Sequence, residues 1–467
     1  MTKRREFIKQ SALGSAAIAM GGIGFSAKSY NSIGGANDRI NLALIGIRNQ
    51  GTVHINNWCG IAKSHNVNLK TLCDTDEALF ERGAKLAQDK TGVRPQTEWD
   101  MLKVFADKEI DAVSIVIPNH WHALATIWAL QAGKHVYIEK PASHNIWEGR
   151  KMVEAARKYD KRVQVGCNNR SSKNVREAIQ FIHDGGIGEL FSARALVFKA
   201  RDSYGMAKDS VPPATFHYDR WLGPAPYRPY NVKRSHYVWH WYWETGNGDT
   251  GNTGPHQLDI ARWGLNKMEH PATVYSTGGL YGLRKDADSP KTPGKRVYGD
   301  VEAYGKDRTT QETPNTQTCS YVYNDGTLLE FECRGRFTNN EGSKGQEVGN
   351  LFYGSDGWLE IYGDEWNAFR ERGREPFASS KKMDENDKEN HFSNFIDAMR
   401  SGKNEDLHCD IYDGFLSTTL PHLANISYRV GHSLKFMGEY EKFANDPEAD
   451  ALLTRVYRKP FIVPDEV

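Results

Sequence analysis

The fold of the first half of this chain is decided by residues 40–51, Ile40-Asn41-Leu42-Ala43-Leu44-Ile45-Gly46-Ile47-Arg48-Asn49-Gln50-Gly51. The first six are mostly apolar and predict a buried strand, and a helix is expected from the glycine turn through Trp58. A strand, a glycine turn and a helix in this order form the dinucleotide-binding fingerprint, because the free N–H groups of the helix N-terminus can receive a pyrophosphate. The turn residues expected to contact such a cofactor are Gly46, Arg48, Asn49, Gln50 and Gly51.

A second predicted strand, residues 67–73, ends in Asp74, which lies 23 residues past Gly51. A carboxylate at this place can bond an adenosine ribose hydroxyl, which favours NAD over NADP. Arg48 stands where the fingerprint has its middle glycine. Its Cβ obstructs close approach of the backbone, but its guanidinium could contact a phosphate or the ribose edge, so NADP remains open.

The same unit repeats along the chain. Helices are predicted over 78–88 and 122–132, and near-continuous apolar strands over 112–117 and 135–138. Alternation of helices with fully apolar strands predicts a doubly wound parallel sheet, and ligands bind at the carboxyl ends of such strands. Four polar residues that follow these strand ends are further candidates for cofactor binding: Asn119, His122, Glu139 and Lys140.

The pattern changes after residue 165, so we expect a Rossmann domain over 38–165 and a substrate-binding α/β domain over 166–467. Strands predicted over 316–323 and 326–332 alternate polar and apolar residues, which is typical of an antiparallel sheet with one exposed face. A helix over 412–428 is a candidate to pack back on the Rossmann domain.

Lys140 and His256 are the candidate catalytic residues. Lys140 lies between Glu139 and Pro141 at a strand end, from which it could hydrogen-bond a carbinol oxygen beside a nicotinamide and transfer a proton. His256 follows Pro255, which suits the first turn of a helix, and imidazole has the titration range of a general acid or base. The alternatives are a surface lysine in a turn and a structural histidine that caps the helix.

Aromatic residues are concentrated between the two candidates, where five of the 12 Trp fall within residues 221–263. Flat aromatic faces with polar edges suit sugar rings, and core packing is an equal alternative. Arg170 is expected either to bind substrate or to pair with an acid. No metal site is expected, since His236 and His240 have zinc spacing without a third ligand and the six cysteines lie far apart. The expected substrate-binding residues are Arg170, Tyr237, Trp239, His240 and Asn252.

Four runs of sequence resemble the glucose-fructose oxidoreductase, inositol dehydrogenase and MocA family (Gfo/Idh/MocA): IPNHWH (117–122), AGKHVYIEKP (132–141), WLGPAPYRPY (221–230) and GNTGPHQLDIARWGL (251–265). The resemblance implies an N-terminal Rossmann domain and a C-terminal α/β domain with an open, mostly antiparallel sheet. It also implies that substrate lies between that sheet and the nicotinamide and that Lys140 is the catalytic lysine.

Many members of that family carry an Asp-x-x-x-His arrangement, whose matching positions here are Asn252 and His256. Asn can orient a substrate hydroxyl but cannot pass a proton, which puts the usual relay in doubt. Asp249 and Asp259 are candidates to replace the missing carboxylate.

The N-terminus has the order of an export signal. Lys3-Arg4-Arg5-Glu6-Phe7-Ile8-Lys9 precedes an Ala/Gly-rich stretch, and the arginine pair resembles a twin-arginine signal over 1–27. A membrane helix and a basic tail are the alternatives. Because the twin-arginine machinery moves folded proteins, we expect a periplasmic or exported protein that carries a non-dissociable cofactor.

Composition limits the remaining function classes. The 60 Lys and Arg nearly balance the 59 Asp and Glu, and no basic run follows the first ten residues, which indicates neither nucleic acid nor stable membrane insertion. We expect an exported NAD(P)-dependent oxidoreductase that acts on CH–OH groups of a carbohydrate or polyol, as a homo-oligomer. The alternatives are a glycoside hydrolase or lyase that oxidises its sugar transiently, and a non-catalytic sugar-binding protein.

Overall fold

The computed structural model describes residues 38–199, 201, 204–281, 311–335, 341–343, 345, 347–370, 375–381 and 390–467. The expected export signal, 1–27, lies outside the described residues.

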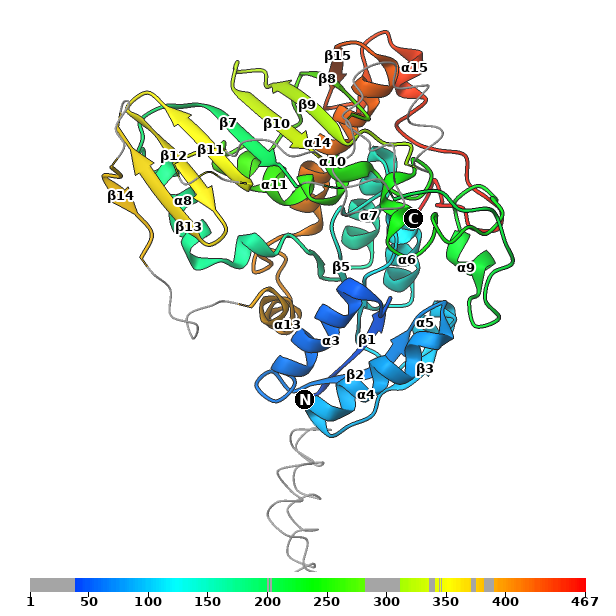
Figure 1. The fold of residues 1–467 in the computed structure, drawn as a ribbon. Coiled ribbons are helices and arrows are strands. Elements are labelled where there is room, and N and C mark those ends of the chain that lie inside the picture. The colour runs from blue at the N-terminus through cyan, green and yellow to red at the C-terminus, as the bar shows by residue number, and fades with distance from the viewer. Residues whose placement is uncertain are drawn as a thin grey trace, which may run out of the picture. The chain divides into compact units, whose positions relative to one another are not determined.

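The N-terminal half is built on a six-stranded parallel sheet (Figure 1). Its strand order, β3-β2-β1-β4-β5-β6, is that of the Rossmann fold. The strands are β1 (Ile40–Ile45), β2 (Val67–Cys73), β3 (Gln96–Glu98), β4 (Ala112–Ile115), β5 (His135–Ile138) and β6 (Val163–Val165). Every residue of β4 and β6 is buried, as expected for strands covered on both faces. The predicted doubly wound sheet is confirmed.

Helices connect these strands, and their bounds differ slightly from the predicted ones. They are α3 (Asn49–Ile61), α4 (Phe80–Thr91), α5 (Met101–Ala106), α6 (Asn119–Gln131) and α7 (Ile146–Lys158). The helix predicted over 122–132 begins three residues earlier, because Pro118 is its N-cap and the polar residues after it already lie in the first turn. The helix predicted over 78–88 is a 3₁₀ turn, Glu77–Leu79, followed by α4.

The C-terminal half contains a ten-stranded mixed sheet of order β14-β13-β12-β11-β7-β10-β9-β8-β15-β16. Its neighbouring strands pair antiparallel except β7 with β10, so the expected mostly antiparallel sheet is confirmed. The strands are β7 (Leu190–Val197), β8 (Thr273–Gly279), β9 (Thr316–Val322), β10 (Leu328–Arg334), β11 (Val348–Gly354), β12 (Gly357–Tyr362), β13 (Glu365–Phe369), β14 (Ala378–Ser379), β15 (Leu434–Met437) and β16 (Lys442–Phe443).

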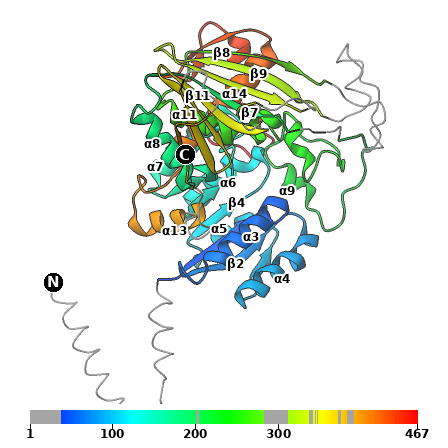
Figure 2. The ribbon, with the colours of Figure 1, turned by 60° about the vertical axis from the view of Figure 1, so that its left-hand side comes forward.

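The C-terminal half also contains helices. They are α8 (Lys173–His183), α9 (Tyr218–Leu222), α10 (Gly248–Asn252), α11 (Gly254–Gly264), α13 (His391–Ser401), α14 (Ile411–Val430) and α15 (Pro447–Asp450). Of these, α8, α11, α14 and α15 contact strands of this sheet, and α13 contacts α3 of the first domain. Both α11 and α14 lie against strands of the large sheet (Figure 2).

Helix α14, which contains the helix expected over 412–428, also packs on the Rossmann domain. Asp410 caps its N-terminus by accepting a hydrogen bond from the backbone N–H of Tyr412. Thr418 Oγ1 accepts a 3.0 Å bond from the backbone N–H of Ala142, just past the end of β5. The residues Asn41–Val467 form one compact unit. Within the described part of the chain, we find no helix with the length and apolar character needed to cross a membrane.

Candidate active site

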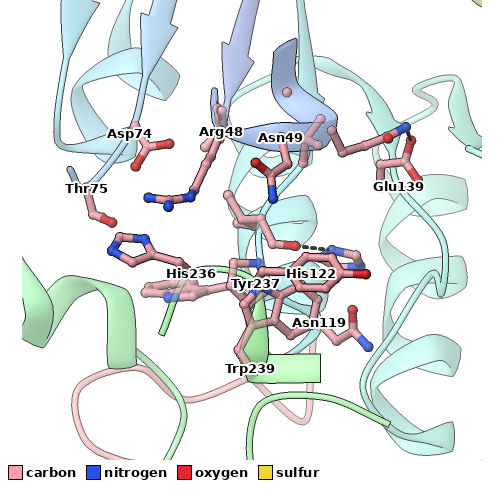
Figure 3. Close-up of a pocket in the computed structure, with 18 of the residues that line it drawn as sticks. Arg48, Asn49, Asp74, Thr75, Asn119, His122, Glu139, His236, Tyr237 and Trp239 are labelled. Carbon is pink, nitrogen blue, oxygen red and sulfur yellow. Dashed lines mark hydrogen bonds between the residues drawn. The ribbon is translucent and has the colours of Figure 1, made fainter. Parts of the chain in front are cut away.

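A cleft of about 570 Å³ opens at the carboxyl ends of β1, β2, β4 and β5, where ligands of such sheets bind. Arg48, Asn49 and Asp74 line it from the Rossmann domain. A segment of the second domain that carries His236, Tyr237 and Trp239 faces them across the cleft (Figure 3). The cleft therefore lies between the two sets of residues that the sequence assigned to cofactor and to substrate.

The turn after β1 depends on two glycines. Gly46 has a φ of +90°, and a Cβ there would lie 2.1 Å from the carbonyl oxygen of Val116. A Cβ on Gly51 would lie 2.1 Å from the carbonyl oxygen of Gly46. Both contacts are with backbone atoms, so the turn can bring the N-terminus of α3 to the cleft only with glycine at these positions. Arg48, the N-cap of α3, keeps its side chain exposed at the cleft.

Asp74 lies at the end of β2 with its carboxylate held by the backbone. It accepts hydrogen bonds from the N–H groups of Ile47 (2.9 Å) and Asp76 (3.0 Å). Burial raises the pKa of Asp74 to about 6 in spite of these bonds. The carboxylate is thus fixed at the cleft wall where the sequence predicted a ribose contact.

A segment of the second domain, residues 213–217, pairs with the chain beside Asp74, and we call it the strap. Its backbone pairs with residues 75–77, and the two backbone hydrogen bonds measure 2.9 and 2.8 Å. The ring of His217 stacks on Trp99 at 4.1 Å between ring centroids, and its Nε2 is 2.7 Å from a carboxylate oxygen of Glu77. The sequence reasoning missed the strap, since nothing local marks a pairing between residues about 140 positions apart.

Glu139 lies under the other end of the cleft and is held by hydrogen bonds. Its Oε1 is 2.8 Å from His54 Nε2 and accepts a 3.1 Å bond from Gln50 Nε2. Burial alone would raise the pKa of Glu139, but His54 and the charge of Lys140 outweigh it and hold the pKa at about 2. His54 also hydrogen-bonds Ser114 at 2.9 Å and was missed, because a single histidine inside a helix carries no sequence signal.

Lys140 faces the cleft and is positioned by the second domain. Its Nζ donates a 2.8 Å hydrogen bond to the backbone oxygen of Asn252 and lies 3.4 Å from the side-chain oxygen of the same residue. Burial lowers the pKa of Lys140 below its ordinary value, since an ammonium group loses hydration there. A larger fraction of the amine is therefore neutral and able to accept a proton.

His256 lines the cleft from the first turn of α11, as its position after Pro255 predicted. Its Nδ1 is buried and has no hydrogen-bond partner among the described residues. Burial, assisted by the charge of Lys140, lowers the pKa of His256 to about 3. A base with so low a pKa holds a proton weakly, which favours an orienting role for His256 over that of the general base.

Neither candidate for the missing relay carboxylate is available to His256. Asp249 lies 2.7 to 2.8 Å from Nε of Arg201. Asp259 receives three hydrogen bonds from Arg170, which are 2.8, 2.9 and 3.1 Å long. The expectation that one of these carboxylates serves His256 is corrected, because both are already paired with guanidinium groups.

Arg170 follows the second of its two expected uses, the pairing with an acid. Its side chain is buried, bound to Asp259 and placed over the ring of Trp263, 5.0 Å from the ring centroid. It is not among the residues that line the cleft. A bidentate ion pair of this kind consumes the donors that a substrate would need.

The aromatic residues concentrated within 221–263, called the aromatic belt below, divide between the core and the cleft. Tyr237, Trp239 and His240 line the cleft, and the rings of Trp239 and His240 stack at 3.6 Å between centroids. Trp241, in contrast, is fully buried in the domain. Part of the aromatic belt is therefore placed to contact a ligand, and part of it packs in the core.

Asn119 and His122 line the cleft, and the Asn119 amide nitrogen and both His122 ring nitrogens bind other protein atoms. His122 has its two ring nitrogens 2.7 Å from the backbone oxygens of Pro141 and Ile117, so it braces the loop that carries Lys140. Asn119 donates a 2.9 Å bond to the side chain of Asn247 across the domain boundary.

The fold and the cleft define a two-domain NAD-binding oxidoreductase, and comparison with family models gives the family. The model of the oxidoreductase family's NAD-binding Rossmann fold matches residues 40–167, and that of its C-terminal alpha/beta domain matches 198–277 and 361–463. The chain belongs to this Gfo/Idh/MocA oxidoreductase family.

Solved structures share the fold at low sequence identity. The WlbA dehydrogenase from Bordetella pertussis, in complex with NADH and UDP-GlcNAcA, is 18% identical with a TM-score of 0.57, over 85% of this chain and 99% of that one. The aldose-aldose oxidoreductase from Caulobacter crescentus, complexed with glycerol, is 16% identical with a TM-score of 0.59, over 85% of this chain and 100% of that one. These similarities show the fold alone.

Curated relatives match shorter stretches. A glycosyl hydrolase family 109 protein of Shewanella baltica (strain OS185) is 24% identical over 209 residues, 41% of this chain and 45% of the relative. The alpha-N-acetylgalactosaminidase of Shewanella oneidensis is 24% identical over 160 residues, 33% of this chain and 34% of the relative. The chain thus spans less than half the length of these relatives.

Proposed function

We propose that this protein is an NAD-dependent oxidoreductase that converts a CH–OH group of a carbohydrate or polyol to a carbonyl group. The observation that carries the proposal is the convergence of Lys140, Asn252 and His256 in one cleft with the backbone-held Asp74. A proton acceptor and a cofactor-anchoring carboxylate on one continuous surface are what such a reaction needs.

The cleft fits a nicotinamide dinucleotide. The N-terminus of α3 can receive the pyrophosphate, and Asp74 can bind ribose hydroxyls. Asp76 lies beside Asp74, so a 2′-phosphate would meet two carboxylates, which supports NAD rather than NADP. The family and its NADH-bound structural neighbours also suggest NAD(H). When bound, this group supplies the hydride acceptor.

Lys140 acts as the general base in this proposal. Its neutral amine accepts the hydroxyl proton while the carbon that bears this hydroxyl loses its hydride. The C=O bond forms, and the substrate loses two electrons. The backbone oxygen of Asn252, 2.8 Å from Nζ, holds the amine in place before and after the transfer. Glu139, whose charge favours the protonated lysine, stabilises the ammonium product. Neutral His256 orients the hydroxyl.

A second candidate function is glycoside cleavage through transient oxidation. The glycosyl hydrolase family 109 relatives favour it. The same first step, proton transfer to Lys140 with loss of hydride, would acidify the adjacent C–H, permit elimination of the aglycone and be reversed after water adds. The two candidates differ in whether the sugar leaves the site oxidised.

The test is a panel of free sugars, polyols and matched nitrophenyl glycosides, incubated with the cofactor-loaded protein. Absorbance of reduced nicotinamide and release of nitrophenol are followed together. We expect reduction of the cofactor by at least one free sugar or polyol. Nitrophenol release without net reduction would select the second candidate, and no response in either channel would contradict both.

Export through the twin-arginine machinery is part of the proposal. Its receptor distinguishes guanidinium from ammonium groups, so replacing Arg4 and Arg5 with lysine should leave the folded protein in the cytoplasm. Cell fractionation with an antibody against the mature chain measures this, and a Lys3→Arg variant serves as a control. Undiminished export of the double variant would contradict the signal.

The cofactor should remain bound through purification. The strap pairs with residues 75–77 beside Asp74 and is our proposed restraint on cofactor release. Protein purified without added nucleotide should release about one nicotinamide dinucleotide per chain on denaturation, measured by chromatography. Such a cofactor must be re-oxidised in place, by a second substrate or by the sugar itself. Empty protein that works only with added NAD would contradict retention.

A further inference from the structure

A second cavity, of about 300 Å³, lies outside the cleft, between the start of α7, the end of α14 and the C-terminal segment 451–456. The lining residues with a bearing on its chemistry are His144, Trp243, Asn247, His422, Arg429 and Arg455. The mechanism above uses none of them.

Two arginines line this cavity without a carboxylate partner. Arg455 Nη1 donates to the backbone oxygen of Glu244 at 2.8 Å and lies 3.2 Å from His144 Nδ1. The Arg429 guanidinium lies over the ring of Trp243, 5.3 Å from its centroid. In the part of the chain that the structure describes, no carboxylate oxygen lies within 4.0 Å of either guanidinium. Burial lowers the pKa of Arg455, whereas the side chain of Arg429 is exposed to solvent.

The histidines of the cavity are neutral. His144 Nε2 lies 3.0 Å from the backbone oxygen of Trp243 and donates to it, so Nδ1 presents the lone pair that accepts from Arg455. Burial lowers the pKa of His144 well below its usual value and that of His422 to about 4. The positive charge of the cavity therefore belongs to the arginines.

Nearby acids act on these arginines through space and make no ion pair with them among the described residues. Glu244 and Glu312 both bind Arg228, at 2.5 and 3.0 Å. Glu148 is fully buried, its Oε1 accepts a 2.9 Å bond from the hydroxyl of Tyr457, and its charge acts on Arg455. Burial raises the pKa of Glu148 to about 7, so a large share of it is uncharged at neutral pH.

We propose that this second cavity binds a small organic dianion, a phosphate monoester or a dicarboxylate, between Arg429 and Arg455. Guanidinium groups bind such oxyanions through paired, charge-assisted hydrogen bonds. The volume leaves room for a short organic body beside the anionic group. The site also has a connection to the cleft, because Asn247 lines the cavity and accepts the 2.9 Å bond from Asn119, which lines the cleft.

The test uses the cofactor-loaded holoenzyme, so that the pyrophosphate site in the cleft is filled. Inorganic phosphate, glycerol 3-phosphate and malonate are titrated calorimetrically at constant ionic strength. Arg455→Gln and Arg429→Gln should each weaken binding by roughly tenfold, the scale of one charge-assisted contact. Arg94→Gln, which removes a guanidinium paired with Glu81 on the Rossmann surface, should leave binding unchanged. If both phosphates bind with higher affinity than malonate, the ligand is a phosphate monoester. If malonate binds with higher affinity, the ligand is a dicarboxylate.

A second readout needs no variant. Phenylglyoxal labels accessible arginines, and mass spectrometry should find Arg455 labelled in the holoenzyme and protected when phosphate is present, whereas Arg94 stays labelled. This decides the matter if Arg455→Gln fails to fold. Absence of binding to the wild type at about 10 mM phosphate, or binding that neither arginine variant changes, would overturn the proposal.

Discussion

Replacing Lys140 with alanine should lower turnover by about 100-fold or more and leave the fold intact, the usual consequence of removing a general base. The pH profile of kcat/KM in the wild type should rise with pH and level off at a pKa below the ordinary lysine value, since burial lowers the pKa of Lys140 and the neutral amine is the active form. Turnover is measured by stopped flow from the retained cofactor, and the fold by circular dichroism.

Two further variants separate the roles of the neighbouring residues. Lys140→Arg keeps the charge but does not titrate, so the rising limb should disappear. His256→Asn should lower turnover and retain the rising limb, because the pKa of His256, about 3, lies far below it. Near-normal turnover in Lys140→Ala would contradict the mechanism and favour a non-catalytic protein.

Gly51→Ala should lower both the free energy of unfolding and the amount of bound cofactor. The new Cβ would lie 2.1 Å from the backbone oxygen of Gly46, so the turn would have to move. We expect a loss of about 3 kcal/mol in the free energy of unfolding, the scale of a backbone clash in a packed region. Denaturant titration measures stability, and chromatography of the denatured protein measures bound nucleotide.

The same helix supplies the matched control. Gly60 lies in the last turn of α3, is exposed, and has no atom of the described residues within 4 Å of a Cβ built on it. Gly60→Ala should stabilise the protein by up to about 1 kcal/mol and preserve its cofactor, since alanine is the better helix former. Equal behaviour of the two variants would contradict the role given to the turn.

Local sequence patterns located four of the six strands of the Rossmann sheet, whereas β3 and β6 were not predicted and β4 ends two residues before the predicted 117. The runs 40–45, 67–73 and 135–138 became β1, β2 and β5 with the predicted bounds, because a strand buried on both faces must be apolar along its length. Candidates at strand ends, such as Asp74 and Lys140, followed from the same pattern, since parallel strands end at one edge of the sheet.

Side-chain partners were less predictable. The residues around Arg170 in the sequence do not tell whether it binds a ligand or an acidic side chain. Only the packing of α11 brings a carboxylate oxygen of Asp259 to 2.8 Å from Nε of Arg170. The replacement of a family carboxylate by Asn252 was visible in the sequence. The pairing of both Asp249 and Asp259 with arginines was not.

What the sequence by itself determined was therefore the order of strands, turns and helices, the glycine turn and the polar strand ends, all of which depend on neighbours a few residues away. Only the tertiary structure decided that the strap pairs beside Asp74 and that His54 hydrogen-bonds Glu139. It also decided the bond between Arg455 and His144, two residues that lie 311 positions apart. Such contacts depend on how the two domains pack. Residues far apart in the sequence carry no local periodicity that relates them, so their pairing appears only when the chain is folded.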